Sequence, residues 1–75
     1  MLKCAKVGVK QSQKALDMGY ALEVYVAKDA QEYVVRHVLE TAEQKGVPIK
    51  WIDSMETLGN MFKIDVGAAT AVITK

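Results

Sequence analysis

The stretch Leu22-Glu23-Val24-Tyr25-Val26-Ala27 decides the fold class of this 75-residue chain. It is nearly continuous in apolar residues and is rich in β-branched and aromatic ones, which favour a β-strand. A strand without a regular polar face is typical of one that is covered on both faces. Because such a strand needs helices on both sides of its sheet, the stretch predicts an α/β fold.

The residues before this strand predict a strand followed by a helix. Residues 5–9 are mostly apolar and make the expected strand, and residues 10–18 make a helix that Gly19 ends. Helical spacing gives this helix an inner side consisting of Ser12, Ala15 and Leu16. Its outer side consists of Lys10, Gln13, Lys14 and Asp17. We therefore expect its lysines to face water.

The residues after the central strand predict two further helices and two strands. Asp29 and Glu32 form a pattern that resembles a helix-capping box, and Asp53 and Glu56 repeat it. The apolar stripe after the first pattern is Val34, Val35, Val38, Leu39 and Ala42, and it ends at Lys45, Gly46 and Pro48. The stripe after the second is Met55, Leu58 and Phe62. Strands are expected over residues 49–52 and 68–74, with a loop over residues 63–67.

This alternation of strands and helices predicts the architecture. Short connections between them favour a three-layer α/β/α sandwich around a mixed sheet of about four strands. Hydrophobic residues make up 51% of the chain and charged residues 25%, which is typical of a chain that folds on its own. We expect one domain over residues 1–75.

Composition also limits the class of protein. Cys4 is the single cysteine, so neither an internal disulfide nor a cysteine-based metal site is expected. No segment has the pattern of a signal peptide or the length needed to cross a bilayer. We expect a cytoplasmic monomer that needs no cofactor and does not bind membranes.

The charge of the chain restricts how it could bind nucleic acid. Ten Lys and Arg residues against nine Asp and Glu residues give a net charge of +1, so binding through a large basic surface is not expected. The first sixteen residues nevertheless contain no acid, and their lysines are Lys3, Lys6, Lys10 and Lys14. Any contact with nucleic acid must therefore be local.

Residues that suit catalysis are few. His37 is the only histidine, and neither it nor Cys4 lies in a pattern that supplies a nucleophile with a base. The acidic pairs that precede the two later helices are better explained as caps than as an acid and base. The run from Gly8 to Lys14 lacks the further glycines of nucleotide-binding loops. We expect that the protein is not an enzyme.

Two segments remain as candidate sites, each with a plain structural alternative. The first is the start of the first helix, where phosphate is attracted by free backbone N–H groups and by Lys10 and Lys14. The Gln11 amide there can hydrogen-bond the edge of a base. The structural alternative is that this side of the helix is only solvated. In the loop Ile64-Asp65-Val66-Gly67-Ala68, apolar side chains flank an acid. They either fold inward or pack against an unstacked base or a protein partner.

Several segments together resemble the kink-turn RNA-binding ribosomal-protein family, the superfamily of archaeal ribosomal protein L-seven-Ae, and most of all its short bacterial members. They are Gly8-Val9-Lys10-Gln11-Ser12-Gln13-Lys14-Ala15-Leu16, Val26-Ala27-Lys28-Asp29-Ala30, Val47-Pro48, Ser54 with Leu58-Gly59, and residues 64–71. The resemblance covers nearly the whole chain. It implies an α/β/α sandwich that binds structured RNA, of the ribosome or of a riboswitch.

The resemblance also implies roles for individual residues. The helix after the first strand enters a kink-turn at its tandem sheared G·A pairs, which assigns those contacts to Gly8, Lys10, Gln11 and Lys14. The late loop packs beside a protruding nucleotide, which assigns that role to Ile64, Asp65, Val66, Gly67 and Ala68. Lys28 and Gln31 become neighbours of the RNA.

This chain departs from the family in two places. Archaeal and eukaryotic members usually carry Asn-Glu where it has Lys10-Gln11, so the individual base contacts are expected to differ. Seven residues precede Gly8, so the family's N-terminal helix is expected to be largely missing and one face of the sheet less covered.

The leading hypothesis is a non-enzymatic protein that recognises and stabilises kink-turn RNA. The alternative is a protein-interaction or ribonucleoprotein assembly module without direct RNA readout.

Overall fold

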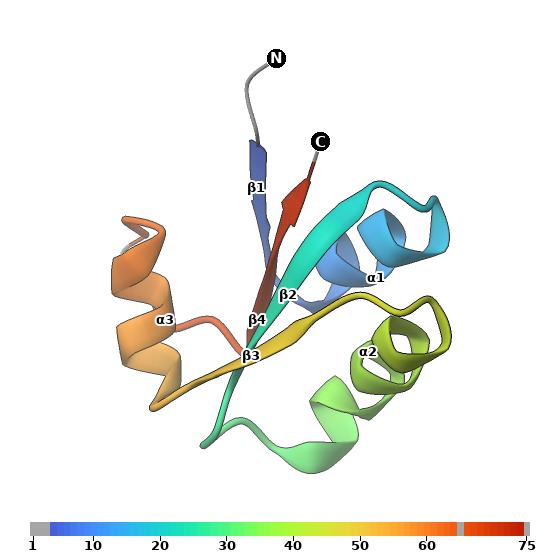
Figure 1. Ribbon diagram of the computed structural model, residues 1–75. Helices are drawn as coiled ribbons and strands as arrows, with labels where there is room; N and C mark the ends of the chain where they lie inside the picture. Colours follow the sequence, from blue (N-terminus) through green and yellow to red (C-terminus); the bar gives the residue numbers. More distant parts are fainter. Residues whose placement is uncertain (1–3, 65, 75) are drawn as a thin grey trace.

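A computed structural model describes residues 4–64 and 66–74. Along the chain the elements are β1 (Cys4–Val7), α1 (Val9–Asp17), β2 (Ala21–Ala27), α2 (Glu32–Gln44), β3 (Ile49–Ile52), α3 (Met55–Met61) and β4 (Thr70–Thr74). The strands form one sheet in the order β1-β4-β2-β3 (Figure 1). The predicted order of strands and helices is confirmed, with ends that shift by one or two residues.

The sheet is mixed, and the directions of its strands place the ends of three strands and the start of the fourth at one edge. β4 runs antiparallel to β1 and to β2, whereas β2 and β3 are parallel. The last residues of β1, β2 and β3 therefore lie at the same edge as the first residue of β4. We call this the carboxyl edge, defined by Val7, Ala27, Ile52 and Thr70.

The helices cover both faces of the sheet. In Figure 1, α1 and α2 lie side by side on one face, and α3 lies on the other. The core under α1 and α2 consists of Ala15, Leu16, Val24, Val26, Val35, Val38, Ala42 and Val72. The core under α3 is smaller and consists of Ala27, Leu58, Ala68 and Ala71. The predicted three-layer sandwich is confirmed.

Apolar spacing explains why these helices form where they do. Ser12, Ala15 and Leu16 are buried on the inner side of α1, as their spacing predicts. The α2 stripe is buried at Val35 and Val38. Gly19 and Gly46 follow the two helices with φ angles of 79° and 69°, a left-handed conformation that glycine adopts without strain.

The expected helix caps are wrong in both cases. The cap of α2 is Gln31, and no side chain bonds the exposed N–H groups there. Asp29 Oδ1 instead accepts a hydrogen bond of 2.8 Å from the N–H of Met55, the first residue of α3. Ser54, not Asp53, caps α3, because its Oγ accepts from the Thr57 N–H at 3.1 Å. Sequence spacing predicted where helices start but not which N–H each carboxylate would reach.

Membrane-spanning helices are not found in the described part of the chain, where no helix combines the needed length and apolarity.

Candidate nucleic-acid interface

The start of α1 is held at the carboxyl edge by a hydrogen bond to β4. Gly8 precedes the helix with a φ of 110°, a conformation that side chains other than glycine rarely adopt. Its N–H donates to the carbonyl oxygen of Thr70 at 2.9 Å. Since Gly8 has no side chain to act as a cap, the first N–H groups of α1 remain open to an external acceptor.

A second bond between α1 and β4 lies beneath this helix start. Thr70 Oγ1 donates to Ser12 Oγ at 3.3 Å, and both residues are fully buried. A buried hydroxyl needs a partner, so this pair fixes how α1 is rotated on the sheet. Sequence reasoning did not identify Ser12 as a positioning residue, although a polar residue on an apolar helical side was a usable signal.

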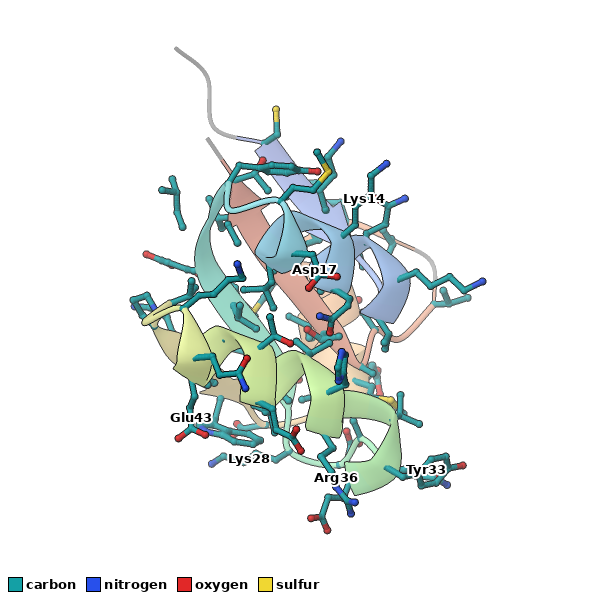
Figure 2. All side chains as sticks on the ribbon, turned by 90° about the vertical axis from the view of Figure 1, so that its right-hand side faces the viewer. Lys14, Asp17, Lys28, Tyr33, Arg36 and Glu43 are labelled. Carbon is teal, nitrogen blue, oxygen red and sulfur yellow. The ribbon has the colours of Figure 1, made fainter. Side chains whose placement is uncertain are left out.

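The exposed side of α1 carries three of the four polar residues predicted for it, Lys10, Lys14 and Asp17, whereas Gln13 is half-buried and its Nε2 donates to Thr41 Oγ1 of α2 at 3.0 Å. Lys10, Gln11 and Lys14 are exposed. Figure 2 shows Lys14 and Asp17 on the outer side of α1. Asp17 Oδ1 accepts from Gln13 Nε2 at 2.9 Å, so this carboxylate is occupied by a neighbour on its own helix. The positive end of α1 and its two lysines together favour an anionic ligand.

The loop before β4 turns one side chain outward and two inward. Val66 is 71% exposed, whereas Ala68 is buried and Ile64 packs partly into the core under α3. Its backbone is held against α3, because the Ala68 N–H donates to the Met55 carbonyl at 3.1 Å. Gly67 packs on Met55 as well, since a β-carbon on it would lie 3.1 Å from the Met55 β-carbon. Asp65 lies outside the described residues.

A third segment follows β2. The Ala27 N–H donates to the Ala69 carbonyl at 2.9 Å, which joins the end of β2 to the loop. Lys28 is exposed, and its Nζ lies 3.9 Å from Asp53 Oδ1. Gln31 is exposed at the start of α2. The sequence-predicted neighbours Lys28 and Gln31 therefore also lie at the carboxyl edge.

Strand order arranges the three segments in a row. Because β4 lies between β1 and β2, the loop that enters β4 lies between Gly8 and Lys28. Neighbouring strands lie about 4.8 Å apart, so the ends of β1 and β2 are separated by about 10 Å. The carboxyl edge thus presents a cationic helix start and the polar start of α2, and the loop that carries the exposed Val66 enters β4 between them. In the described ranges, no group of three or more His, Cys, Asp and Glu residues could hold a metal ion.

The chain is similar to known proteins over most of its length. It is 52% identical to an RNA-binding protein of Caldanaerobacter subterraneus over 65 residues, which cover 87% of this chain and 79% of that protein. It is 35% identical to large ribosomal subunit protein eL8 of Halobacterium salinarum over 69 residues, which cover 91% of this chain and 58% of that protein.

A solved structure shares the fold. The 15.5 kDa RNA-binding protein of Giardia lamblia matches with a TM-score of 0.88 at 33% identity, over 95% of this chain and 60% of that chain. The chain thus spans three-fifths of that relative. The model of the ribosomal protein L7Ae/L30e/S12e/Gadd45 family matches residues 3–75. The chain therefore belongs to the ribosomal protein L7Ae/L30e/S12e/Gadd45 family.

Proposed function

We propose that this chain is a non-enzymatic, cytoplasmic RNA-binding protein that recognises and stabilises kink-turn motifs through its carboxyl edge. The names of its relatives in Caldanaerobacter and Giardia support RNA as the ligand. Regular A-form RNA hides its base edges in a deep, narrow groove, so a protein that reads them needs a distorted site. A kink with tandem sheared G·A pairs is such a site.

The α1 start contacts the kink itself in this proposal. Lys10 and Lys14 bind phosphates and guanine edges, and the Gln11 amide bonds a base because it can both donate and accept. Gly8 allows RNA to approach the open N–H groups of the first turn, since no side chain projects there. Nothing lies within 4 Å of the position where a Gly8 β-carbon would stand, so that approach is unobstructed by the protein.

The loop contacts a protruding nucleotide in this proposal. Val66 offers the exposed apolar side chain, and Gly67 offers exposed backbone, while its lack of a side chain lets the loop pack against Met55. Ile64 and Ala68 support the loop from inside, and Asp65 completes the segment. Lys28 and Gln31 border the same nucleotide from the start of α2.

One observation carries the proposal. The hydrogen bond from Gly8 to Thr70 joins the start of α1 to the strand that the loop enters. Two segments that are 56 residues apart in the sequence (Gly8 and Ile64) are thereby held on one edge, where a single kinked RNA can contact both.

The test is a titration of the protein against a kink-turn RNA and against the same RNA with its G·A pairs replaced by Watson-Crick pairs. We expect much tighter binding to the first. Lys14→Glu should abolish that binding, and Lys45→Glu is the control, because it makes the same charge change after the far end of α2. Equal affinity for the two RNAs would refute kink-turn recognition.

A second candidate function is a protein-interaction or assembly module. It is favoured by exposed apolar side chains on α3 and the loop, namely Met55, Met61 and Val66. On this alternative, Lys14→Glu leaves association with a protein partner intact, whereas Met61→Asp abolishes it.

A further inference from the structure

The first turn of α2 carries an exposed aromatic side chain that the proposed function leaves unused. Tyr33 is the second residue of α2, and 75% of its surface is exposed. In Figure 2 its ring points away from the body of the protein, at the end of the molecule where α1 and α2 both begin. Tyr33 therefore stands at the carboxyl edge, two residues beyond Gln31.

The packing of α1 on α2 places Tyr33 relative to the proposed RNA contacts. Gln13 Nε2 donates to Thr41 Oγ1 at 3.0 Å, so these two residues lie at the same level of the two helices. One turn before Gln13 the chain reaches Val9, the first residue of α1. Tyr33 lies two turns before Thr41, and it therefore projects beyond the α1 start, where RNA bound to that start would continue.

The charges around Tyr33 differ from those on α1. The charged residues within five positions of Tyr33 in the sequence are Lys28, Asp29, Glu32 and Arg36, two acidic and two basic. Arg36 Nη2 lies 3.8 Å from Glu32 Oε1, and Lys28 is paired with Asp53, so both cations already have partners. A phosphate would therefore gain little electrostatic attraction at this position, whereas the acidic side chains do not repel an uncharged nucleobase.

We propose that Tyr33 is a stacking platform for an unpaired nucleobase of the bound RNA. The RNA interface then has two parts, in which the α1 start holds phosphates and the α2 start holds a base. Aromatic rings stack on bases of any sequence, and unpaired bases at a distorted site can turn outward to meet them. This inference rests on the proposed function, because it takes the kinked RNA as the ligand.

The test compares Tyr33→Ala and Tyr33→Phe with the unchanged protein, using the kink-turn RNA. Loss of one stacked base should weaken binding about 5- to 140-fold in Tyr33→Ala, and Tyr33→Phe should bind normally. The slope of log affinity against log salt should stay unchanged in Tyr33→Ala, because no phosphate contact is lost. Met18→Ala is the control, since Met18 is 64% exposed at the far end of α1.

A second RNA, in which the unpaired nucleotides are abasic, identifies what Tyr33 contacts. On this RNA, Tyr33→Ala should bind as tightly as the unchanged protein, because the base that would stack is absent. An equal loss on both RNAs would show a contact with the RNA backbone and overturn the stacking role.

The outcomes separate this inference from the proposed function. If the unchanged protein prefers kink-turn RNA and Tyr33→Ala binds it equally well, the stacking role is wrong and kink-turn recognition stands. If the unchanged protein binds the Watson-Crick control RNA equally well, both fail together. Because Tyr33 is exposed, Tyr33→Ala should keep the melting temperature of the unchanged protein, which excludes misfolding as the cause of any loss.

Discussion

Gly59 of α3 lies directly against the carbonyl oxygen of Val66, so closely that a β-carbon on Gly59 would overlap with that oxygen. Gly59 is itself buried and has ordinary helical geometry. Its lack of a side chain therefore serves close approach and not an unusual backbone angle. The contact sets where the loop crosses α3, and with it the direction in which Val66 projects.

Gly59→Ala should destabilise the protein and displace the loop. Overpacking a tight contact costs about 1–3 kcal/mol, and here the opposing atom belongs to the backbone, which yields less easily than a side chain. Urea unfolding measures the loss, and RNA titration measures the effect on the loop. Asn60→Ala is the control, since Asn60 is exposed on the same helix and should change stability by less than about 0.5 kcal/mol. An unchanged midpoint for Gly59→Ala would contradict the described contact.

Asp29→Ala should destabilise the start of α3. The Asp29 carboxylate accepts the Met55 N–H, and removing such a cap costs about 0.5–2 kcal/mol. Asp53→Ala should cost about 0–1 kcal/mol, because Asp53 forms only an exposed ion pair with Lys28. Thermal unfolding of the two variants provides the measurement. The capping pattern in the sequence predicts that Asp29→Ala and Asp53→Ala lose the same stability. Equal losses would therefore contradict the hydrogen bond from Met55 to Asp29.

Lys10→Ala should weaken RNA binding and also lower its dependence on salt. If about three lysines contact phosphate, the slope of log affinity against log salt is about −2 to −3, and each lost contact makes it shallower by about 1. Lys45→Ala should leave the slope unchanged, because Lys45 follows the far end of α2. Binding isotherms at several salt concentrations give the slopes. A much steeper slope in the unchanged protein would mean that the RNA contacts far more of the surface than the carboxyl edge.

Tyr25 should make the stability of the protein sensitive to alkaline pH. Its hydroxyl donates to Glu23 Oε2 at 2.7 Å, and this bond, together with burial and the charge of Glu23, raises the pKa of Tyr25 above its ordinary value of 10.0. Because the folded protein favours the neutral hydroxyl, the stabilisation is present below pH 10.0 and is lost as the pH rises through the raised pKa.

Tyr25→Phe tests this pH dependence. The variant lacks the hydroxyl and keeps an aromatic ring opposite Phe62, which packs edge-on against Tyr25 at 5.8 Å. The difference in unfolding free energy between the two proteins should shrink as the pH rises above 10.0 and through the raised pKa of Tyr25. A difference that stays constant over this range would show that Glu23 does not favour the neutral hydroxyl.

The sequence predicted only part of the candidate site. The exposure of Lys10 and Lys14 follows from helical spacing, because spacing dictates which side chains share a side, whereas the half-buried Gln13 does not follow from it. Which loop side chain is exposed could not be predicted from the sequence, since Ile64 and Val66 are both apolar. Their exposure differs because Gly59 and Met55 hold the loop backbone. These contacts join residues about 7 to 13 positions apart, which is beyond the reach of helical or strand spacing.

The sequence by itself determined the α/β class, the order of strands and helices, and the buried sides of α1 and α2, because apolar periodicity and turn residues act over a few neighbouring positions. Only the tertiary structure decided which helix Asp29 caps and which segments share the carboxyl edge. Those outcomes depend on the strand order β1-β4-β2-β3, which places Thr70 beside Gly8 through pairing across the whole chain.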